Sequence, residues 1–163
     1  MDVGSVVQVA GALGLGSVLG QYLSSSGQRR QTRADVLQAL AQCEQARWYH
    51  LGESGSVATA SRDLTSAAMI ARIPPEPVRA YLAVAGAAGG ASREHWEQHE
   101  DEEYAGSIGT EMGRLVSASA GIVADLAWSP IRYRVGLVRR MKALRESAEG
   151  VKQAEDIDWD RIY

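Results

Sequence analysis

A long stretch without charge at the start of the chain restricts the fold more than any other feature. No charged side chain lies between Asp2 and Arg29. A helix crosses the roughly 30 Å hydrocarbon layer of a bilayer with about 20 mainly apolar residues, and residues 3–23 reach that length. Their glycines lower the hydropathy, but glycine is more frequent in transmembrane helices than in soluble ones. The sequence therefore predicts a transmembrane anchor at residues 1–24.

Three arginines follow this stretch and give the predicted anchor a direction. Arg29, Arg30 and Arg33 lie in residues 25–33, which we interpret as a basic juxtamembrane exit. Because basic loops stay on the cytoplasmic side, we expect a single-pass protein of the inner (plasma) membrane with a cytoplasmic C-terminus. Two alternatives stay open. A cleaved signal would carry its basic residues before the apolar part, and an Ala/Gly-rich helix could instead form the core of a soluble oligomer.

Small residues recur along one face of the predicted anchor. Ala12, Gly16 and Gly20 follow one another at intervals of four residues, so they drift by only about 80° around a helix. Two helices approach closely where such residues meet, and the contacts between them replace contacts with lipid. The pattern predicts helix association and a homo-oligomer, although small residues are also common throughout this stretch.

The composition of the chain favours helices and excludes some kinds of site. Ala, Leu, Arg, Glu and Gln are plentiful and Phe is absent, and runs of β-branched residues, which favour strands, are scarce. The single cysteine, Cys43, cannot form an intrachain disulfide or a site with several thiolate ligands. The net charge of -3 is too small to indicate a polyanionic or polycationic partner for the whole chain.

Apolar residues recur at helical spacing in several segments after residue 33. Pro74 and Pro130 interrupt the pattern, and Pro77 suits the first turn of a helix. We expect the helix that starts there to decay in the small-residue run at 85–92. The predicted helices cover residues 34–48, 58–72, 77–85, 107–127 and 131–148.

Each predicted helix has a face that we expect to lie inside the protein. These residues are Val36, Leu37, Leu40 and Cys43 in the first helix, Ala60, Leu64, Ala67, Ala68 and Ala71 in the second, Val78, Tyr81, Leu82 and Ala85 in the third, Met112, Leu115, Val116, Ser119, Ile122, Val123 and Leu126 in the fourth, and Val135, Val138, Met141, Leu144 and Arg145 in the fifth.

The fold class that follows is all-α. We predict an N-terminal transmembrane helix followed by an antiparallel helical bundle of three to five helices. Residues 34–149 form the cytoplasmic helical domain, and residues 150–163 are an acidic tail that we expect to be loosely held.

Two histidines raise the possibility of a metal site. His95 and His99 lie four residues apart and would share one face of a helix, where zinc could bind them if a third ligand came from elsewhere. The intervening residues are WEQ, so the glutamate is not where the HExxH helix of a zinc hydrolase needs it. We favour a solvated polar face and keep a metal-dependent enzyme as an alternative.

The helix predicted at 131–148 carries the strongest basic cluster. Trp128 and Tyr133 are aromatic rings suited to the headgroup level of a bilayer, and a basic residue near an anionic surface contributes about 1 kcal/mol. The alternatives are a solvated face, intrachain pairing with the acidic residues of 94–103 and a protein partner; nucleic acid is less favoured, since no recognition motif is present. The candidates for contact with an anionic surface are Arg132, Arg134, Arg139 and Arg140.

The segment from Gln28 to Trp48 reads QRRxxRADVLxALxxxExARW. In this segment and in the preceding Gly/Ala/Val stretch the chain resembles a broad group of small uncharacterised bacterial proteins. The resemblance implies an N-terminal membrane anchor and a short helical cytoplasmic domain. It covers the first third of the chain and brings no activity with it.

These features together predict a non-enzymatic, single-pass membrane protein that needs no cofactor. We expect its helical domain to act as an interaction or scaffold module, self-associating through the anchor and contacting membrane lipid or a protein partner. One alternative is a membrane-perturbing effector or holin-like protein, in which associated anchors make a lesion. The other is the metal-dependent enzyme that would use His95 and His99.

Overall fold

The computed structural model describes residues 27–47, 54–99 and 108–162. All regular structure in these ranges is helical, which confirms the all-α prediction for this part of the chain. The α-helices cover residues 27–47, Ser54–Ile70 (α2), Pro75–Gln98 (α3), Thr110–Trp128 (α4), Pro130–Arg134 (α5) and Leu137–Ala148 (α6), and short 3-10 helices cover Lys152–Ala154 (η1) and Trp159–Arg161 (η2).

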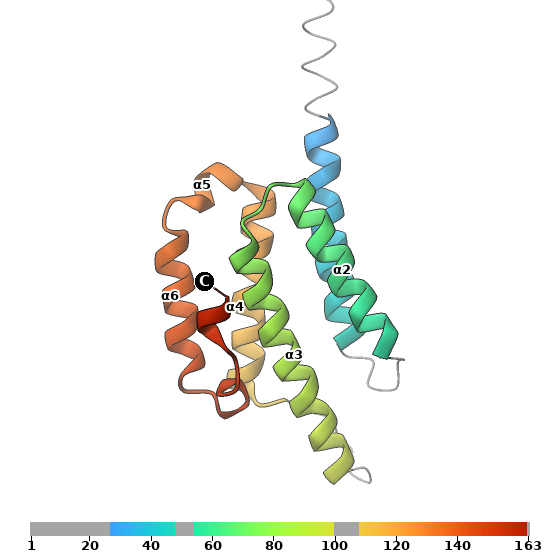
Figure 1. The fold of residues 1–163 in the computed structure, drawn as a ribbon, viewed down its shortest axis with the longest axis vertical. Coiled ribbons are helices and arrows are strands. Elements are labelled where there is room, and N and C mark those ends of the chain that lie inside the picture. Colours follow the sequence, from blue (N-terminus) through green and yellow to red (C-terminus); the bar gives the residue numbers. More distant parts are fainter. Residues whose placement is uncertain (1–26, 48–53, 100–107, 163) are drawn as a thin grey trace, which may run out of the picture.

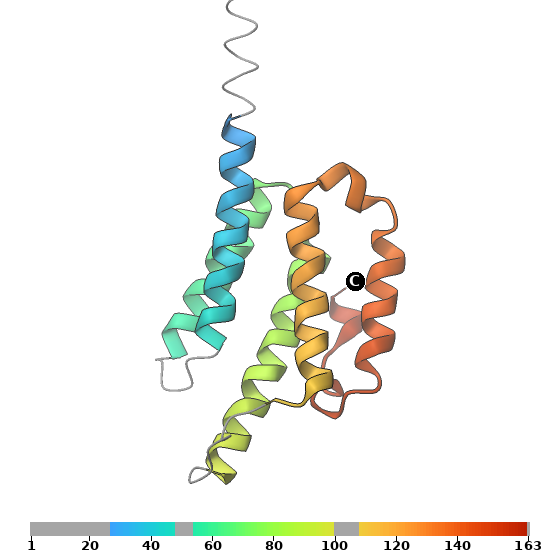
Figure 2. The same ribbon diagram turned by 180° about the vertical axis from the view of Figure 1, so that it is seen from behind.

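The helices form an up-and-down bundle. Figure 1 and Figure 2 show that the helix over residues 27–47 and α2 form an antiparallel pair on one side. The α3 and α4 helices lie in the middle and pack extensively on each other, and α6 lies on the other side. Short α5 crosses the end of the bundle between α4 and α6. The predicted antiparallel helical bundle is therefore confirmed.

The core consists of the inward faces of these helices. All seven residues predicted to line the fourth helix are buried, from Met112 to Leu126. The helix over residues 27–47 contributes Val36, Leu40 and Cys43, as predicted, together with Ala39. These faces could be predicted from the sequence because their apolar residues recur at helical spacing without interruption.

None of the helices within the three described ranges is both long and apolar enough to cross a bilayer. The predicted anchor at residues 1–24 and its association residues, Ala12, Gly16 and Gly20, lie outside the described residues.

The third helix is much longer than the sequence predicted. It runs for 24 residues from Pro75 to Gln98, so the expectation that it decays at 85–92 is wrong. Pro75 occupies the first helical position, where its missing N–H would have no intrahelical partner. Farther along, Ala88 and Ser92 are buried. This burial and the high helix propensity of alanine outweigh the cost of about 1 kcal/mol for each interior glycine.

The helix predicted at 131–148 is divided in two. α5 ends at Arg134, and Gly136 adopts φ 85°, a left-handed conformation that favours glycine, before α6 begins. The turn resets the helical phase. Val135 and Val138 are therefore exposed, and their predicted inward placement is wrong, whereas Met141 and Leu144 are buried as predicted.

The C-terminal segment packs on the bundle, so the prediction of a loosely held tail is wrong for residues 151–162. Val151, Ala154, Trp159 and Ile162 are buried although the residues between them are mostly charged or polar. Their hydrophobic burial holds the tail in place despite its acidic composition.

Candidate functional site

One end of the bundle gathers several features that are distant in the sequence. We call residues 128–139, from the last residue of α4 to the first turn of α6, the elbow. Figure 1 and Figure 2 show the elbow at the end of the bundle where α2 ends, which is also the end nearest the first described residues of the helix over residues 27–47. Arg29 and Arg30 lie exposed in the helix over residues 27–47, and Arg33 is partly buried.

Three of the four predicted anion-contacting arginines are exposed at the elbow. Arg132 and Arg139 are exposed, and exposed Arg134 donates a 2.8 Å hydrogen bond from Nη2 to the carbonyl oxygen of Arg72. No acidic residue occurs between Asp125 and Glu146 in the sequence. The elbow therefore presents positive charge without acidic residues of its own.

The fourth, Arg140, has an intrachain partner. Its Nη2 lies 2.6 Å from Oδ2 of Asp125, and its guanidinium lies 5.4 Å from the centroid of the Tyr133 ring. Its Nη1 is buried and has no hydrogen-bond partner among the described residues. This geometry suits a residue that ties α6 to α4 and α5, and anionic contact by Arg140 stays a prediction.

Apart from Trp128, sequence reasoning missed the apolar side of the same surface. Six of the seven large apolar side chains that are exposed among the described residues lie at this end. In the elbow, Trp128 is 70% exposed, Ile131 86%, Val135 83% and Val138 82%. Met69 and Ile70 are the other two, at the end of α2. One sequence signal could have predicted that these elbow residues are exposed. Pro130 and Gly136 lie close together, and a helix between them is too short to present a buried apolar face.

The end of α2 is shaped by a residue in an unusual conformation. Arg72 has φ 57° and its N–H donates to the Met69 carbonyl, while the N–H of Ile73 donates to the Ala68 carbonyl. This pair of hydrogen bonds is the Schellman ending of a helix, which usually places glycine where Arg72 lies. It orients the Arg72 carbonyl toward the Arg134 side chain of the elbow.

The predicted acidic partner of the basic residues lies elsewhere. Residues 93–98 end α3 at the opposite end of the bundle from α5 (Figure 1, Figure 2). The elbow arginines therefore do not pair with Glu94 or Glu97. The remainder of the acidic segment, residues 100–103, lies outside the described residues.

His95 and His99 stack on each other at the end of α3. Their ring centroids are 4.3 Å apart with an interplanar angle of 19°, and Nδ1 of His99 lies 3.1 Å from the carbonyl oxygen of His95. Within the described ranges, no group of three His, Cys, Asp or Glu side chains is placed to hold a metal ion. Residues 48–53 and 100–107 are outside that search.

A partly buried polar network lies between the helix over residues 27–47 and α3. The Tyr81 hydroxyl donates a 2.7 Å hydrogen bond to Oε1 of Glu44, and Nη2 of Arg47 lies 2.7 Å from Oε2 of the same carboxylate. Burial and this hydrogen bond raise the pKa of Tyr81 far above its ordinary value. Burial, with the negative charges of Glu44 and Asp63, raises the pKa of the Cys43 thiol to about 11. A thiol held protonated in this way is a poor nucleophile.

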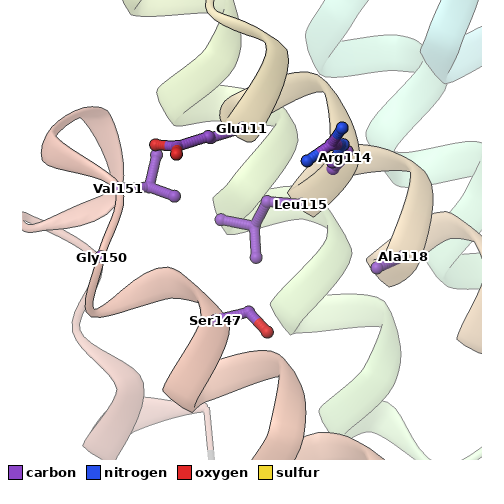
Figure 3. Close-up of a pocket in the computed structure, with 7 residues that line it drawn as sticks. All are labelled: Glu111, Arg114, Leu115, Ala118, Ser147, Gly150 and Val151. Carbon is purple, nitrogen blue, oxygen red and sulfur yellow. The ribbon is translucent and has the colours of Figure 1, made fainter.

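A surface pocket of about 310 Å³ lies between α4 and the end of α6. Figure 3 shows Glu111, Arg114, Leu115 and Ala118 of α4 on one side, and Ser147, Gly150 and Val151 on the other. It was not predicted from the sequence. Its lining mixes one acid, one base and one hydroxyl with apolar groups, which does not specify a reaction.

Comparison with models of protein families, with curated proteins and with solved structures found no match. The function is therefore argued from the chain itself. Of the surfaces described, the elbow combines exposed apolar side chains with exposed arginines, a composition that suits contact with an anionic amphiphile.

Proposed function

We propose that the protein is a non-enzymatic, single-pass membrane protein whose helical domain serves as an interaction or scaffold module on the cytoplasmic side. In this proposal residues 1–24 form the anchor, and Arg29, Arg30 and Arg33 keep the bundle in the cytoplasm. The anchors associate through Ala12, Gly16 and Gly20.

The observation that carries the proposal is the exposure of Arg29 and Arg30 at one end of the bundle. Residues 27–31 are exposed, and Figure 1 shows this end of the helix over residues 27–47 extending past the neighbouring helices. Arg29 is the first charged residue after the uncharged stretch that follows Asp2. A polar helical turn with two exposed arginines suits the boundary between headgroups and cytoplasm.

Fractionation of the expressed full-length chain tests the anchor. We expect the protein to remain in the membrane pellet after a carbonate wash, and a C-terminal tag to be cut by protease only when the cytoplasmic face is exposed. Release by carbonate would overturn the anchor, and protection of the tag on exposed cytoplasmic faces would overturn the orientation.

A second experiment tests self-association in the membrane. Substitution of Gly16 and Gly20 by Ile places branched side chains where close helix contact is proposed, so crosslinked oligomers of the full chain should disappear. Val18→Ile with Leu19→Ile is the matched control, because it adds no bulk at Gly16 or Gly20. Unchanged oligomers in the glycine variant would overturn association through this face.

A further inference from the structure

The elbow contains a helix that contributes little to the core, with Tyr133 partly buried against it. α5, Pro130–Arg134, has no buried residue, although it is flanked by α4 and α6, which have many. Soluble monomers seldom gather large exposed apolar side chains in one patch without a binding role. Trp128, Ile131 and Val135 therefore need an explanation other than packing.

We propose that the elbow is a second membrane contact, which docks on an anionic bilayer surface. In this arrangement Trp128, Ile131 and Val135 enter the boundary between headgroups and acyl chains, and Arg132 and Arg139 contact lipid phosphates. The inference rests on the proposed membrane anchor, which would hold the elbow next to the lipid.

The alternation of residue types within the elbow fits a bilayer surface. Ile131, Arg132, Tyr133, Arg134 and Val135 place apolar and basic side chains side by side. Arginine side chains can lie along apolar neighbours while their guanidinium groups reach the phosphates. The absence of acidic residues between Asp125 and Glu146 removes repulsion from an anionic surface.

The topology places the elbow where an anchored chain would meet lipid. The N-terminal part of the helix over residues 27–47 lies at the same end of the bundle as the elbow (Figure 1, Figure 2). A short connection from the anchor makes docking an intramolecular event, so weak contacts suffice because the effective concentration of lipid is high.

The composition of the patch favours lipid over two other occupants. A nucleic acid would match the arginines, but would leave Ile131 and Val135 without an apolar partner. A second copy of the elbow would bring two sets of Arg132, Arg134 and Arg139 together without acidic partners. An anionic bilayer matches both the charge and the apolar side chains.

Fluorescence of the full-length chain in vesicles tests the proposal. Cys43→Ala removes the native thiol, and Ile131→Cys then carries a nitrobenzoxadiazole label at a side chain that is almost fully exposed, where folding is not at risk. We expect a blue shift, and quenching by lipids brominated near the headgroup, in vesicles of phosphatidylcholine with phosphatidylglycerol. The matched control, Gln153→Cys, is exposed at the opposite end of the bundle and should show neither effect.

Charge removal gives an independent measurement. The double variant Arg132→Gln, Arg139→Gln should weaken docking by about 25-fold, because each arginine contributes a factor of roughly five to affinity for an anionic surface. Arg93→Gln with Lys152→Gln removes the same charge from the opposite end and should leave the quenching unchanged.

The outcomes separate the docking surface from the anchor. A chain that carbonate retains, but whose label at 131 is not quenched, would overturn the elbow and leave the anchor intact. A chain that carbonate releases, but whose label is quenched when the protein is added to anionic vesicles, would support the elbow and overturn the anchor. A shift that depends on protein concentration in detergent, or on added DNA instead of lipid, would overturn lipid as the occupant.

Discussion

The hydroxyl of Tyr81 donates a 2.7 Å hydrogen bond to Oε1 of Glu44, and this contact joins α3 to the helix over residues 27–47. Tyr81 is fully buried, and the carboxylate that it contacts also pairs with Arg47. A hydrogen bond to a charged acceptor in such a place fixes the position of one helix against the other.

Tyr81→Phe should destabilise the protein. The substitution keeps the ring in the core but removes the donor to Glu44, so we expect the free energy of unfolding to fall by about 1–2 kcal/mol. Urea unfolding followed by circular dichroism measures the change. Tyr133→Phe is the matched control, because the Tyr133 hydroxyl forms no hydrogen bond with the described residues and its loss should change stability by less than about 0.5 kcal/mol. Equal effects of the two variants would contradict a special role for the Tyr81 hydroxyl.

Cys43 should make stability depend on alkaline pH. Its pKa is about 11 in the folded protein and 9.0 ordinarily, so the folded state holds this proton more tightly than the unfolded state. The stabilisation is therefore complete below pH 9 and is lost as the pH rises toward 11. Cys43→Ala should show a shallower loss of stability across this window than the parent chain. Parallel pH profiles in urea unfolding would contradict the assignment.

Arg140 and Arg139 are adjacent in sequence but should respond differently to substitution. Arg140→Ala removes the ion pair with Asp125 and the packing on Tyr133, and should lower the free energy of unfolding by about 1 kcal/mol. Arg139→Ala removes an exposed side chain and should stay within about 0.5 kcal/mol of the parent. Thermal unfolding of the two variants side by side is the measurement, and a larger loss for Arg139→Ala would reverse the assigned roles.

Two glycines in α3 should be replaceable with a gain in stability. A Cβ built at Gly86 or Gly90 meets no atom within 4 Å, so Gly86→Ala and Gly90→Ala should each stabilise the protein by about 0.5–1 kcal/mol. Gly136→Ala is the contrasting variant: its surroundings are equally open, but φ 85° strains any side chain, and stability should fall by about 1 kcal/mol. Chemical unfolding of the three variants tests whether space or backbone conformation decides the sign.

The sequence predicted the interior of this protein better than its turns. The stripe from Met112 to Leu126 was predicted in full, because one helix of constant phase positions every residue in it. The predicted inward placement of Val135 and Val138 was wrong because the turn at Gly136 interrupts the helical periodicity. The prediction assumed one continuous helix across this turn. The length of α3 was missed since glycine and alanine together give no apolar stripe, while burial of Ala88 and Ser92 is a tertiary effect.

The candidate surface was only half predicted. Basic residues are recognisable by type, so Arg132, Arg134 and Arg139 could be named from the sequence. Exposed isoleucine and valine look like core residues until the fold is known, and Ile131 and Val135 were therefore missed as surface residues. The position of the elbow at the same end of the bundle as the N-terminal part of the helix over residues 27–47 could have been predicted, since four antiparallel helices return the chain to that end.

The length of α3 determines how far the residues at its C-terminal end lie from the elbow. Its 24 residues extend about 36 Å at roughly 1.5 Å per residue, and Figure 2 shows its last turns projecting past the end of α4. The Debye length at physiological ionic strength is only about 8 Å. Solvent ions would therefore screen the charges of Glu94 and Glu97 from a lipid surface at the elbow. The two ends of the bundle could then contact oppositely charged neighbours at the same time.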